Sequence, residues 1–320
     1  MPSWGEILNE LSAGLSAGAP LTFFDETRDK YLNNLVTLTS RPVVVYASDF
    51  LGKGGQGTAI RLSDMQGLME VFKDVPGPNL DLILHSPGGE AEATERLVRY
   101  MRSKFSHIRI FIPLAAMSAA TMWTMAADEI VMGKHSQLGP IDPQISLNGG
   151  PNIPAGALIE QFEEANKQCA EDPKRITGWL PTLQQYPPGI LNVCESATLL
   201  SKQLVKQWLE TYIFKADPAK VQKSTDISNW LADDHVHLSH SRPITREDLR
   251  EKGLPITNLE EDSRLQDAVL SVHHCLMHTF AMTSAVKIVE NNLKNRWIQH
   301  GGFQTVSVGP APTPTSALLP

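Results

Sequence analysis

The apolar positions of this chain form short, nearly continuous runs that alternate with segments of helical spacing. After one of these runs, for example, Ala93, Leu97, Val98 and Met101 fall on one face of a helix. Short apolar runs are typical of parallel strands that are covered on both faces. The pattern therefore predicts an α/β fold built around a parallel sheet. The predicted strands are residues 42–48, 80–85, 108–113 and 129–133.

Helical patterns precede and follow this core. Residues 2–38 hold one or two amphipathic helices, and residues 262–300 form a long stretch that we interpret as helical. Within the core, helices are predicted at 154–169, 190–214 and 243–253, and the proline-containing stretch 177–189 is predicted to be irregular and is a candidate flap over a site. We divide the chain into an N-terminal helical segment (1–40), a core (41–260), a C-terminal helical extension (261–300) and a tail (301–320) whose composition predicts disorder.

Two glycines follow the second apolar run, where the sequence reads Ser86-Pro87-Gly88-Gly89 before a helical pattern begins at Glu90. Glycine permits positive φ and lets a ligand approach the backbone closely. The N–H groups at the start of a helix also lie near its positive end, which favours a negative charge there. The motif is typical of an oxyanion-binding turn, with a plain strand-to-helix turn as the alternative.

Ser118 occupies the equivalent place after the third run. It opens a helical pattern that continues to about residue 127, and its neighbours are alanines and methionines. Acyl-transfer chemistry requires an exposed nucleophile beside free backbone N–H groups. We therefore predict Ser118 as a nucleophile, with a serine that only caps a helix as the alternative.

Four motifs in this order, SPGG, AMSAATM, AADEIVM and LGPIDPQ, resemble the serine dehydrogenase proteinase family of ClpP-class serine peptidases. That family is similar to signal peptide peptidase A and, more distantly, to the Clp protease proteolytic subunit and the crotonases. The resemblance is strong over residues 43–144 and returns weakly up to about residue 259. It implies a ClpP/crotonase-like ββα superhelix with N- and C-terminal helical extensions, and a homo-oligomer. It also implies that Ser118 is the nucleophile and that the N–H groups of Gly88 or Gly89 and of Ala119 form the oxyanion hole.

The base that accepts the Ser118 proton is harder to assign. In Clp-type peptidases it is a histidine on the strand after the serine helix, and the matching positions here, near Ile141 and Asp142, hold none. Relatives of signal peptide peptidase A use a Ser-Lys dyad with the lysine on a later helix, a pattern that Lys167 fits best. The alternatives are Lys174 and Lys202, and a solvated surface role for Lys167.

Three other polar residues, Asp142, His85 and His135, lie near the motifs. Asp142 either orients the base or a substrate amide, or it binds backbone N–H groups in its turn. His85 either lines the site or is a core or rim histidine, and His135 is interpreted as a surface or turn residue rather than as the base.

The remaining histidines do not predict a metal. The alternating run His235, His237 and His240 lacks a partner set of carboxylates or cysteines, so it is weak evidence for zinc. The resemblance implies a short strand in this region, and we therefore expect these histidines to lie on an exposed strand face. His274 and His278 share a helix face at i, i+4, which alone is weak evidence for a metal site.

Composition indicates an ordinary enzyme. The 320 residues carry a formal net charge of −7, which argues against nucleic acid as a partner because phosphate contacts need clustered Lys and Arg. The three cysteines are few and odd in number, which is typical of reduced thiols. No apolar run has the length of a membrane span and no signal-peptide pattern is present, so we expect a cytoplasmic protein without a membrane partner.

We therefore expect a cytosolic serine endopeptidase that forms an acyl-enzyme on peptide or protein substrates through a Ser118–Lys167 dyad, without a cofactor or metal. A crotonase-like acyl-CoA enzyme is the alternative, in which a carboxylate such as Asp142 serves as acid or base. A second alternative is a catalytically inactive scaffold of the same fold.

Overall fold

The predicted strands lie side by side in one eight-stranded sheet of the computed structural model, which describes residues 3–147, 150–301 and 306–308. The parallel strands are β1 (Val43–Ser48), β2 (Asn79–His85), β3 (His107–Ile112), β5 (Glu129–Met132) and β10 (Ile256–Asn258). The antiparallel additions are β11 (Ala285–Asn291), β12 (Arg296–His300) and β13 (Val306–Val308). The strand order is β10-β5-β3-β2-β1-β11-β12-β13, and the predicted α/β class is confirmed.

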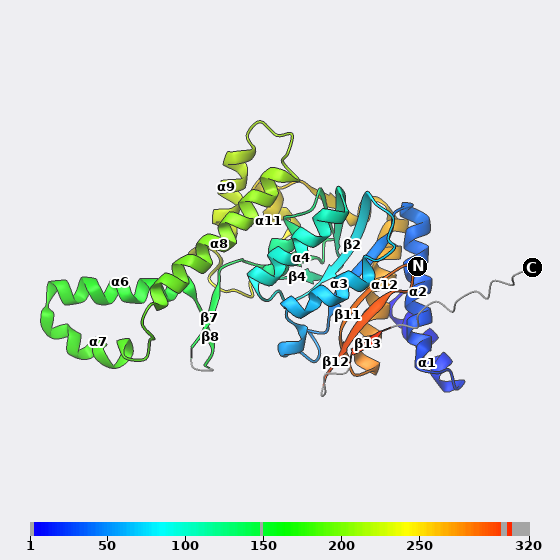
Figure 1. Ribbon diagram of the computed structural model, residues 1–320, viewed down its shortest axis with the longest axis horizontal. Helices are drawn as coiled ribbons and strands as arrows, with labels where there is room; N and C mark the ends of the chain where they lie inside the picture. The colour runs from blue at the N-terminus through cyan, green and yellow to red at the C-terminus, as the bar shows by residue number, and fades with distance from the viewer. Residues whose placement is uncertain (1–2, 148–149, 302–305, 309–320) are drawn as a thin grey trace, which may run out of the picture.

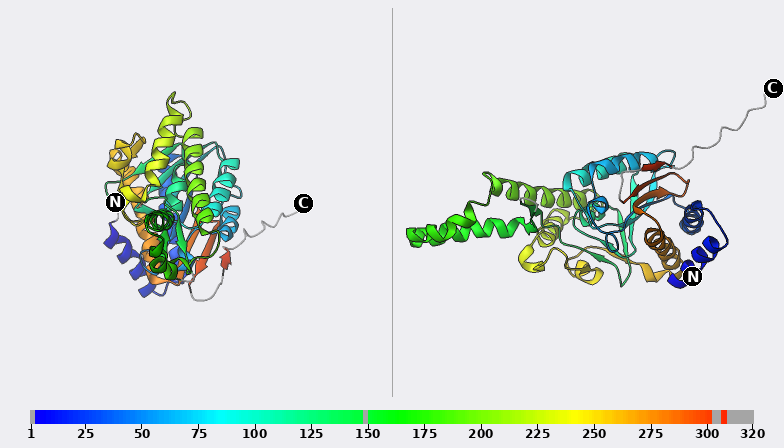
Figure 2. Two further views of the ribbon diagram at one scale, coloured as in Figure 1. Left: turned by 90° about the vertical axis from the view of Figure 1, so that its left-hand side faces the viewer. Right: turned by 90° about the horizontal axis from the view of Figure 1, so that it is seen from below.

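Helices cover both faces of this sheet (Figures 1 and 2). On one face lie α3 (Met65–Val71), α4 (Ala91–Lys104), α5 (Ala119–Thr124), α8 (Ile190–Thr211) and α9 (Lys220–Leu231). On the other face lie α1 (Trp4–Ser16), α2 (Thr22–Thr39) and α12 (Ser263–Met282). Successive side chains of a strand point to opposite faces, and accordingly Val44 and Tyr46 of β1 join the first hydrophobic core while Val43 and Val45 join the second.

Short elements connect these layers. They are α10 (Asp234–His237), α11 (Arg246–Glu251) and the 3-10 turns η1 (Gln56–Thr58), η2 (Leu62–Asp64), η3 (Pro173–Arg175) and η4 (Leu259–Glu261). In the described part of the chain, no helix has the length and apolar character that crossing a membrane requires. The disorder predicted for the tail concerns residues that, apart from 301 and 306–308, lie outside the described ranges.

The helix predicted over residues 262–300 is wrong beyond Met282. Residues 285–291 form β11 instead, pair antiparallel with β1 and are buried along their whole length. Their composition explains the difference, because Val286, Ile288 and Val289 are β-branched and fit a pleated, buried surface better than a helix. The C-terminal segment therefore completes the central sheet.

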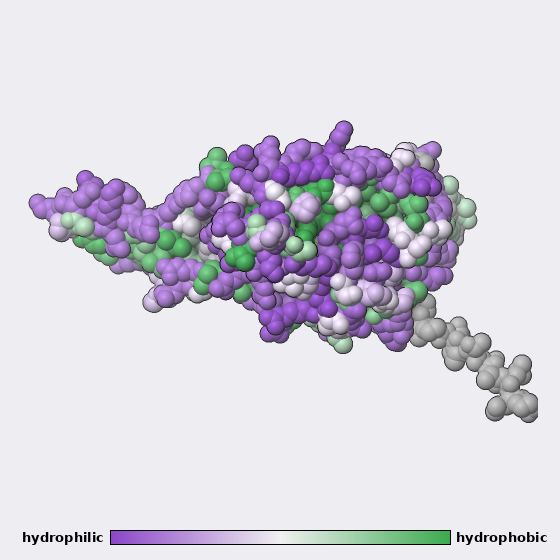
Figure 3. All heavy atoms as spheres, turned by 90° about the horizontal axis from the view of Figure 1, so that it is seen from above, coloured by the Kyte–Doolittle hydropathy of each residue, from purple (hydrophilic) through white to green (hydrophobic). Residues whose placement is uncertain are grey.

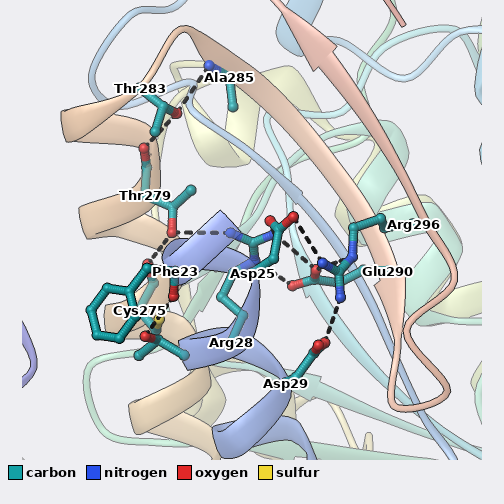
Figure 4. Close-up of polar contacts among 11 residues, drawn as sticks. Phe23, Asp25, Arg28, Asp29, Cys275, Thr279, Thr283, Ala285, Glu290 and Arg296 are labelled. Carbon is teal, nitrogen blue, oxygen red and sulfur yellow. Dashed lines mark hydrogen bonds and ion pairs between the residues drawn. The ribbon is translucent and has the colours of Figure 1, made fainter. Parts of the chain in front are cut away.

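A buried ion cluster fixes the N-terminal helices to these added strands (Figure 4). Arg28 of α2 donates from Nε to Glu290 of β11 at 2.8 Å, and neither side chain is exposed to solvent. Arg296 of β12 contacts Asp29 of α2 at 2.6 Å and Glu290 at 3.9 Å. The cluster joins elements from the two ends of the chain, so both terminal segments pack as parts of the same body as the core.

An arm of two helices, α6 (Ala155–Glu171) and α7 (Ile176–Leu183), projects from this body and leads back through α8 (Figures 1 and 2). The helices predicted at 154–169 and 190–214 are confirmed, whereas the irregular structure predicted for 177–189 is wrong over α7, which continues through Pro181. Hydrophobic surface runs along the arm (Figure 3), where Ile176 and Leu180 are exposed.

Candidate active site

A separate small sheet is formed by β4 (Ala115–Ala116), β6 (Gln137–Leu138) and β9 (Ile244–Thr245). Strands β4 and β6 are parallel, and β9 is antiparallel to β6. The carboxyl ends of β4 and β6 and the amino end of β9 therefore meet at one edge. Ser118 follows β4, Asp142 follows β6 and His240 precedes β9, so these three residues, distant in sequence, come to the same edge.

Ser118 lies on a sharp turn between β4 and α5. Its backbone has φ 51° and ψ −121°, a region that non-glycine residues rarely adopt. Such a conformation costs on the order of 1–3 kcal/mol and is found preferentially at functional sites. The Ser118 side chain makes no capping hydrogen bond to α5, so helix capping does not account for its position.

The glycine turn lies directly against this serine. Gly88 has φ 91°, and a Cβ added to it would lie 2.5 Å from the Met117 carbonyl oxygen and 2.7 Å from the Ala119 nitrogen. Only glycine fits this contact. Pairing of the end of β2 with β4 fixes it, since Ser86 donates to the Ala115 carbonyl at 3.1 Å and accepts from the Met117 N–H at 2.9 Å.

The two candidate N–H donors of the turn differ. The Gly88 N–H already donates to the Ser86 hydroxyl at 3.2 Å. For the Gly89 N–H, no acceptor is found within the described residues. Ala119 is the first residue of α5, so its N–H has no carbonyl of its own helix to bind. Gly89 and Ala119 are therefore the donors most available to an oxyanion.

These groups line one cavity of about 550 Å³. Its walls include Gly88, Gly89, Ser118, Ala119, Asp142 and His240. The structure thus brings together most of the site residues expected from the sequence, and adds His240 to them.

Asp142 and His240 form a pair in this cavity. The Nδ1 atom of His240 lies 2.7 Å from Oδ1 of Asp142, whose second oxygen accepts from the Gln144 amide at 2.6 Å. The Asp142 side chain is 5% exposed and that of His240 is 26% exposed. The Asp142 carboxylate therefore holds an imidazole in the cavity, and both roles predicted for Asp142 stay predictions.

The lysines lie elsewhere. Lys167 is exposed on α6 of the arm and Lys174 is exposed in η3, and neither lines the cavity. Lys202 of α8 is half-buried and lines a neighbouring cavity that shares Asp142 and Pro143 with the first. Lys167 is distant because α6, which the sequence does place correctly as a helix, points away from the body (Figure 1).

The other histidines also differ from expectation. His85 does not line the cavity but is buried against Phe50 and His273, and burial lowers its pKa to about 4. The expected strand bearing His235 and His237 is wrong, because residues 234–237 form α10 after an Asp233 cap. In the described part of the chain, no group of three or more His, Cys, Asp or Glu side chains is arranged to hold a metal.

Sequence reasoning passed over His240 as a site residue. The signal for it lies next to a strand pair: Leu138 is opposite Ile244, and Asp142 and His240 each lie four residues beyond this pair, in the loops where their side chains meet. That register is visible only once β6 and β9 are known to pair.

Comparison with known proteins gives the same family as the motifs. Residues 60–184 match the ClpP-like SDH-type serine proteinase family. Two uncharacterized proteins of Methanocaldococcus jannaschii, MJ0137 and MJ1495, are 25% identical over 205 residues and 24% identical over 200 residues. These matches cover 63% and 62% of this chain, which spans only 63% and 59% of the length of the two relatives.

Two solved structures are also similar in part. Both are variants of the 1510-N membrane-bound stomatin-specific protease, the second in complex with a substrate peptide. Their sequences are 13% and 14% identical to this chain and their TM-scores are 0.34 and 0.36. Each match covers 62% of this chain, and 74% and 70% of the respective protease chain. We infer nothing about the site from structures this distant.

The resemblance predicted from the motifs is thus confirmed over the segment that carries them. The matched residues, 60–184, include Gly88, Gly89, Ser118 and Asp142 and are similar to the ClpP-like SDH-type serine proteinase family.

Proposed function

We propose that this chain is a serine endopeptidase that cleaves peptide bonds through an acyl-enzyme on Ser118. The observation that carries the proposal is the strained turn at Ser118, which lies in a cavity beside the glycine turn and the first N–H of α5. A serine held in this way can attack a carbonyl carbon while nearby N–H groups bind the oxygen that becomes negative.

The reaction has two halves. The Ser118 Oγ bonds to the scissile carbonyl carbon as its proton passes to a base, and the oxyanion accepts hydrogen bonds from the N–H groups of Ala119 and Gly89, or of Gly88. Collapse of this intermediate breaks the C–N bond, and the leaving amine takes the proton from the base. Water then attacks the ester by the same steps and releases the acid and free Ser118.

A peptide substrate is supported by the two-stranded sheet at the rim of the cavity, β7 (Gln144–Ser146) and β8 (Asn152–Pro154). Gln144, Ile145 and Asn152 of this hairpin line the cavity. An extended peptide can add to a strand edge through main-chain hydrogen bonds, which bind any sequence, while side-chain pockets select among them.

The proposal retains three expectations from the sequence. A Ser-Lys dyad would need Lys167 to reach Ser118 from another copy of the chain or after movement of the arm, or Lys202 to turn toward the cavity. A homo-oligomer would supply such a second copy. A cytoplasmic location is supported by the cysteines, since Cys169, Cys194 and Cys275 are all free thiols.

Labelling with a fluorophosphonate probe tests the proposal. We expect the wild-type chain to be labelled and Ser118→Ala to be unlabelled. Ser201→Ala is the matched control, because Ser201 is a buried serine that lines the same cavity, and it should be labelled like the wild type. Absence of labelling in the wild type would contradict the proposal, and saturable binding of coenzyme A in that case would favour the crotonase-like alternative.

A further inference from the structure

We propose that the buried ion pair between Lys287 of β11 and Asp64 of η2 positions the Gly89 N–H, a candidate oxyanion donor of the glycine turn. Neither charged side chain is among the described residues that line the cavity at Ser118, and Lys287 lies outside the matched segment 60–184. This role rests on the proposed peptidase function, because it gives the ion pair an effect on the rate of that reaction.

The backbone of Ile60 lies directly against the glycine turn. Its N–H donates to the Gly88 carbonyl at 2.7 Å, and its own carbonyl accepts from the Glu90 N–H at 3.0 Å. The two bonds form a parallel bridge between Ile60 and Gly89, which is so close that a Cβ on Gly89 would lie 2.3 Å from the Ile60 oxygen. The glycine turn is therefore held on this side by main-chain bonds to residue 60.

These bonds decide the direction of the Gly89 N–H. The Gly88 carbonyl and the Gly89 N–H belong to one peptide group, and in a planar trans peptide these two bonds point in opposite directions. Because the Gly88 carbonyl points toward Ile60, the Gly89 N–H points away from Ile60. Glycine populates many backbone conformations, so contacts rather than side chains must prevent a rotation that would present the carbonyl oxygen in place of the N–H.

The ion pair holds Ile60 from the opposite side. Lys287 Nζ donates to the Ala59 carbonyl at 2.7 Å, and Asp64 accepts from the Arg61 N–H at 3.0 Å. The Ala59 carbonyl shares a peptide group with the Ile60 N–H, and the Arg61 N–H shares one with the Ile60 carbonyl. Each peptide group of Ile60 is therefore bound to the ion pair on one side and to the glycine turn on the other.

The ion pair is buried and fully bonded. Besides the Ala59 carbonyl, Lys287 Nζ contacts the two Asp64 oxygens at 2.9 and 2.8 Å, and the exposed fractions of the two side chains are 1% and 0%. Tyr46 donates its hydroxyl to Asp64 at 2.6 Å. Apolar residues of similar size would stabilise a fold about as well as a buried ion pair, whereas only polar groups can bind the peptide groups of Ile60.

The test is a double variant that removes both charges, so that neither is left unpaired. Lys287→Met with Asp64→Asn keeps the approximate size of both side chains and an acceptor for the Arg61 N–H, but it removes the donor to the Ala59 carbonyl. With a fluorophosphonate probe, we expect the rate constant of the chemical step, kinact, to fall by about 10²-fold, as when a catalytic group is slightly misplaced. The probe concentration for half-maximal rate, KI, should not change.

The rate constant separates positioning from a loss of folded protein. Unfolding of part of the sample lowers the fraction that is labelled but leaves kinact of the remaining molecules unchanged. Tyr46→Phe is a milder second variant, which removes one donor to Asp64 and keeps the aromatic ring against Trp123. It should lower kinact by about 10-fold, and it decides the question if the double variant does not fold.

Glu290→Gln is the matched control. Glu290 also lies on β11 and is fully buried in an ion cluster, but its partners are Arg28 and Arg296 rather than the segment around Ile60. At a temperature where circular dichroism shows this variant to be folded, its kinact should equal the wild-type value.

The outcomes separate this role from the peptidase proposal. A wild-type kinact in the folded double variant, or in Tyr46→Phe if the double variant does not fold, would overturn the positioning role. An equal fall in Glu290→Gln would overturn it too. In both cases labelling of the wild type that is lost in Ser118→Ala would leave the peptidase proposal standing, whereas an unlabelled wild type would overturn both.

Discussion

Gly88 lies so close to Ser118 that a Cβ on the glycine would be 2.7 Å from the Cβ of the serine. This contact joins the two motifs that the sequence presents separately, the glycine turn after β2 and the serine after β4. The geometry of the candidate oxyanion site therefore depends on residue 88 being a glycine.

Gly88→Ala should therefore abolish activity. The added methyl group would clash with the Met117 carbonyl oxygen and the Ala119 nitrogen, and the alanine backbone would have to adopt φ 91°. We expect fluorophosphonate labelling to fall by at least about 10²-fold, as when an oxyanion donor is lost. Gly178→Ala is the control, because Gly178 lies in helix α7 with no atom near its Cβ position. The Gly178→Ala variant should be labelled normally and be slightly more stable, since alanine loses less conformational freedom than glycine on forming a helix. Normal labelling of Gly88→Ala would argue against the assigned site.

Asp142→Asn should lower kcat far more than it raises KM. The substitution keeps the shape of the side chain but removes the negative charge that lies 2.7 Å from His240 Nδ1 and that would stabilise a protonated His240 during the reaction. We expect a fall in kcat of about 10²–10⁴-fold, measured on a fluorogenic peptide. A variant that is folded, as judged by circular dichroism, and has an unchanged kcat would show that Asp142 is only structural.

Glu290→Gln should destabilise the fold without touching the cavity. Glu290 is fully buried between Arg28 and Arg296. Loss of its charge removes the only fully buried anion of the cluster and leaves the two buried arginines with the partly exposed Asp25 and with Asp29. We expect the free energy of unfolding to decrease by about 3–5 kcal/mol, measured by urea denaturation. As a control, Arg99→Ala breaks an exposed ion pair with Glu95 and should lower the free energy of unfolding by less than about 1 kcal/mol. Equal losses of stability in the two variants would contradict the role assigned to the buried cluster.

Acid should destabilise the protein through His85. Burial lowers its pKa from 6.5 to about 4, so this histidine is neutral in the folded chain at pH values where the unfolded chain binds a proton. The contribution of neutral His85 to the free energy of unfolding is complete above pH 6.5. It decreases as the pH falls toward 4, by an amount on the order of 3 kcal/mol. His273, which packs against His85, should also make the fold less stable in acid, because burial lowers its pKa well below the usual value.

The measurement for this prediction is the free energy of unfolding at pH 7.5 and pH 5. His85→Phe, which keeps an aromatic ring against Phe50 and His273, should reduce the difference between the two pH values. His235→Gln, at an exposed position, should leave it unchanged. If His85→Phe showed the full wild-type difference, the pH dependence would have another source.

The sequence by itself determined the parts of this protein that depend on local pattern. The apolar runs identified β1, β2, β3 and β5, since a strand covered on both faces is mostly apolar over a short length. The motifs around Gly88 and Ser118 identified the strand-to-helix turns, because backbone conformation at such turns restricts which residues fit.

Only the tertiary structure decided which residues from distant segments meet. Asp142 and His240 are 98 residues apart and meet in the loops beyond two short paired strands, a pairing that no local pattern specifies. Lys167 was correctly placed on a helix, but the direction in which that helix leaves the body put it outside the cavity. The sequence pattern predicts a helix for the segment that forms β11, whereas pairing with β1, far away in the sequence, adds this segment to the sheet. Local propensities are fixed by neighbouring residues, whereas these contacts are fixed by how complete elements pack.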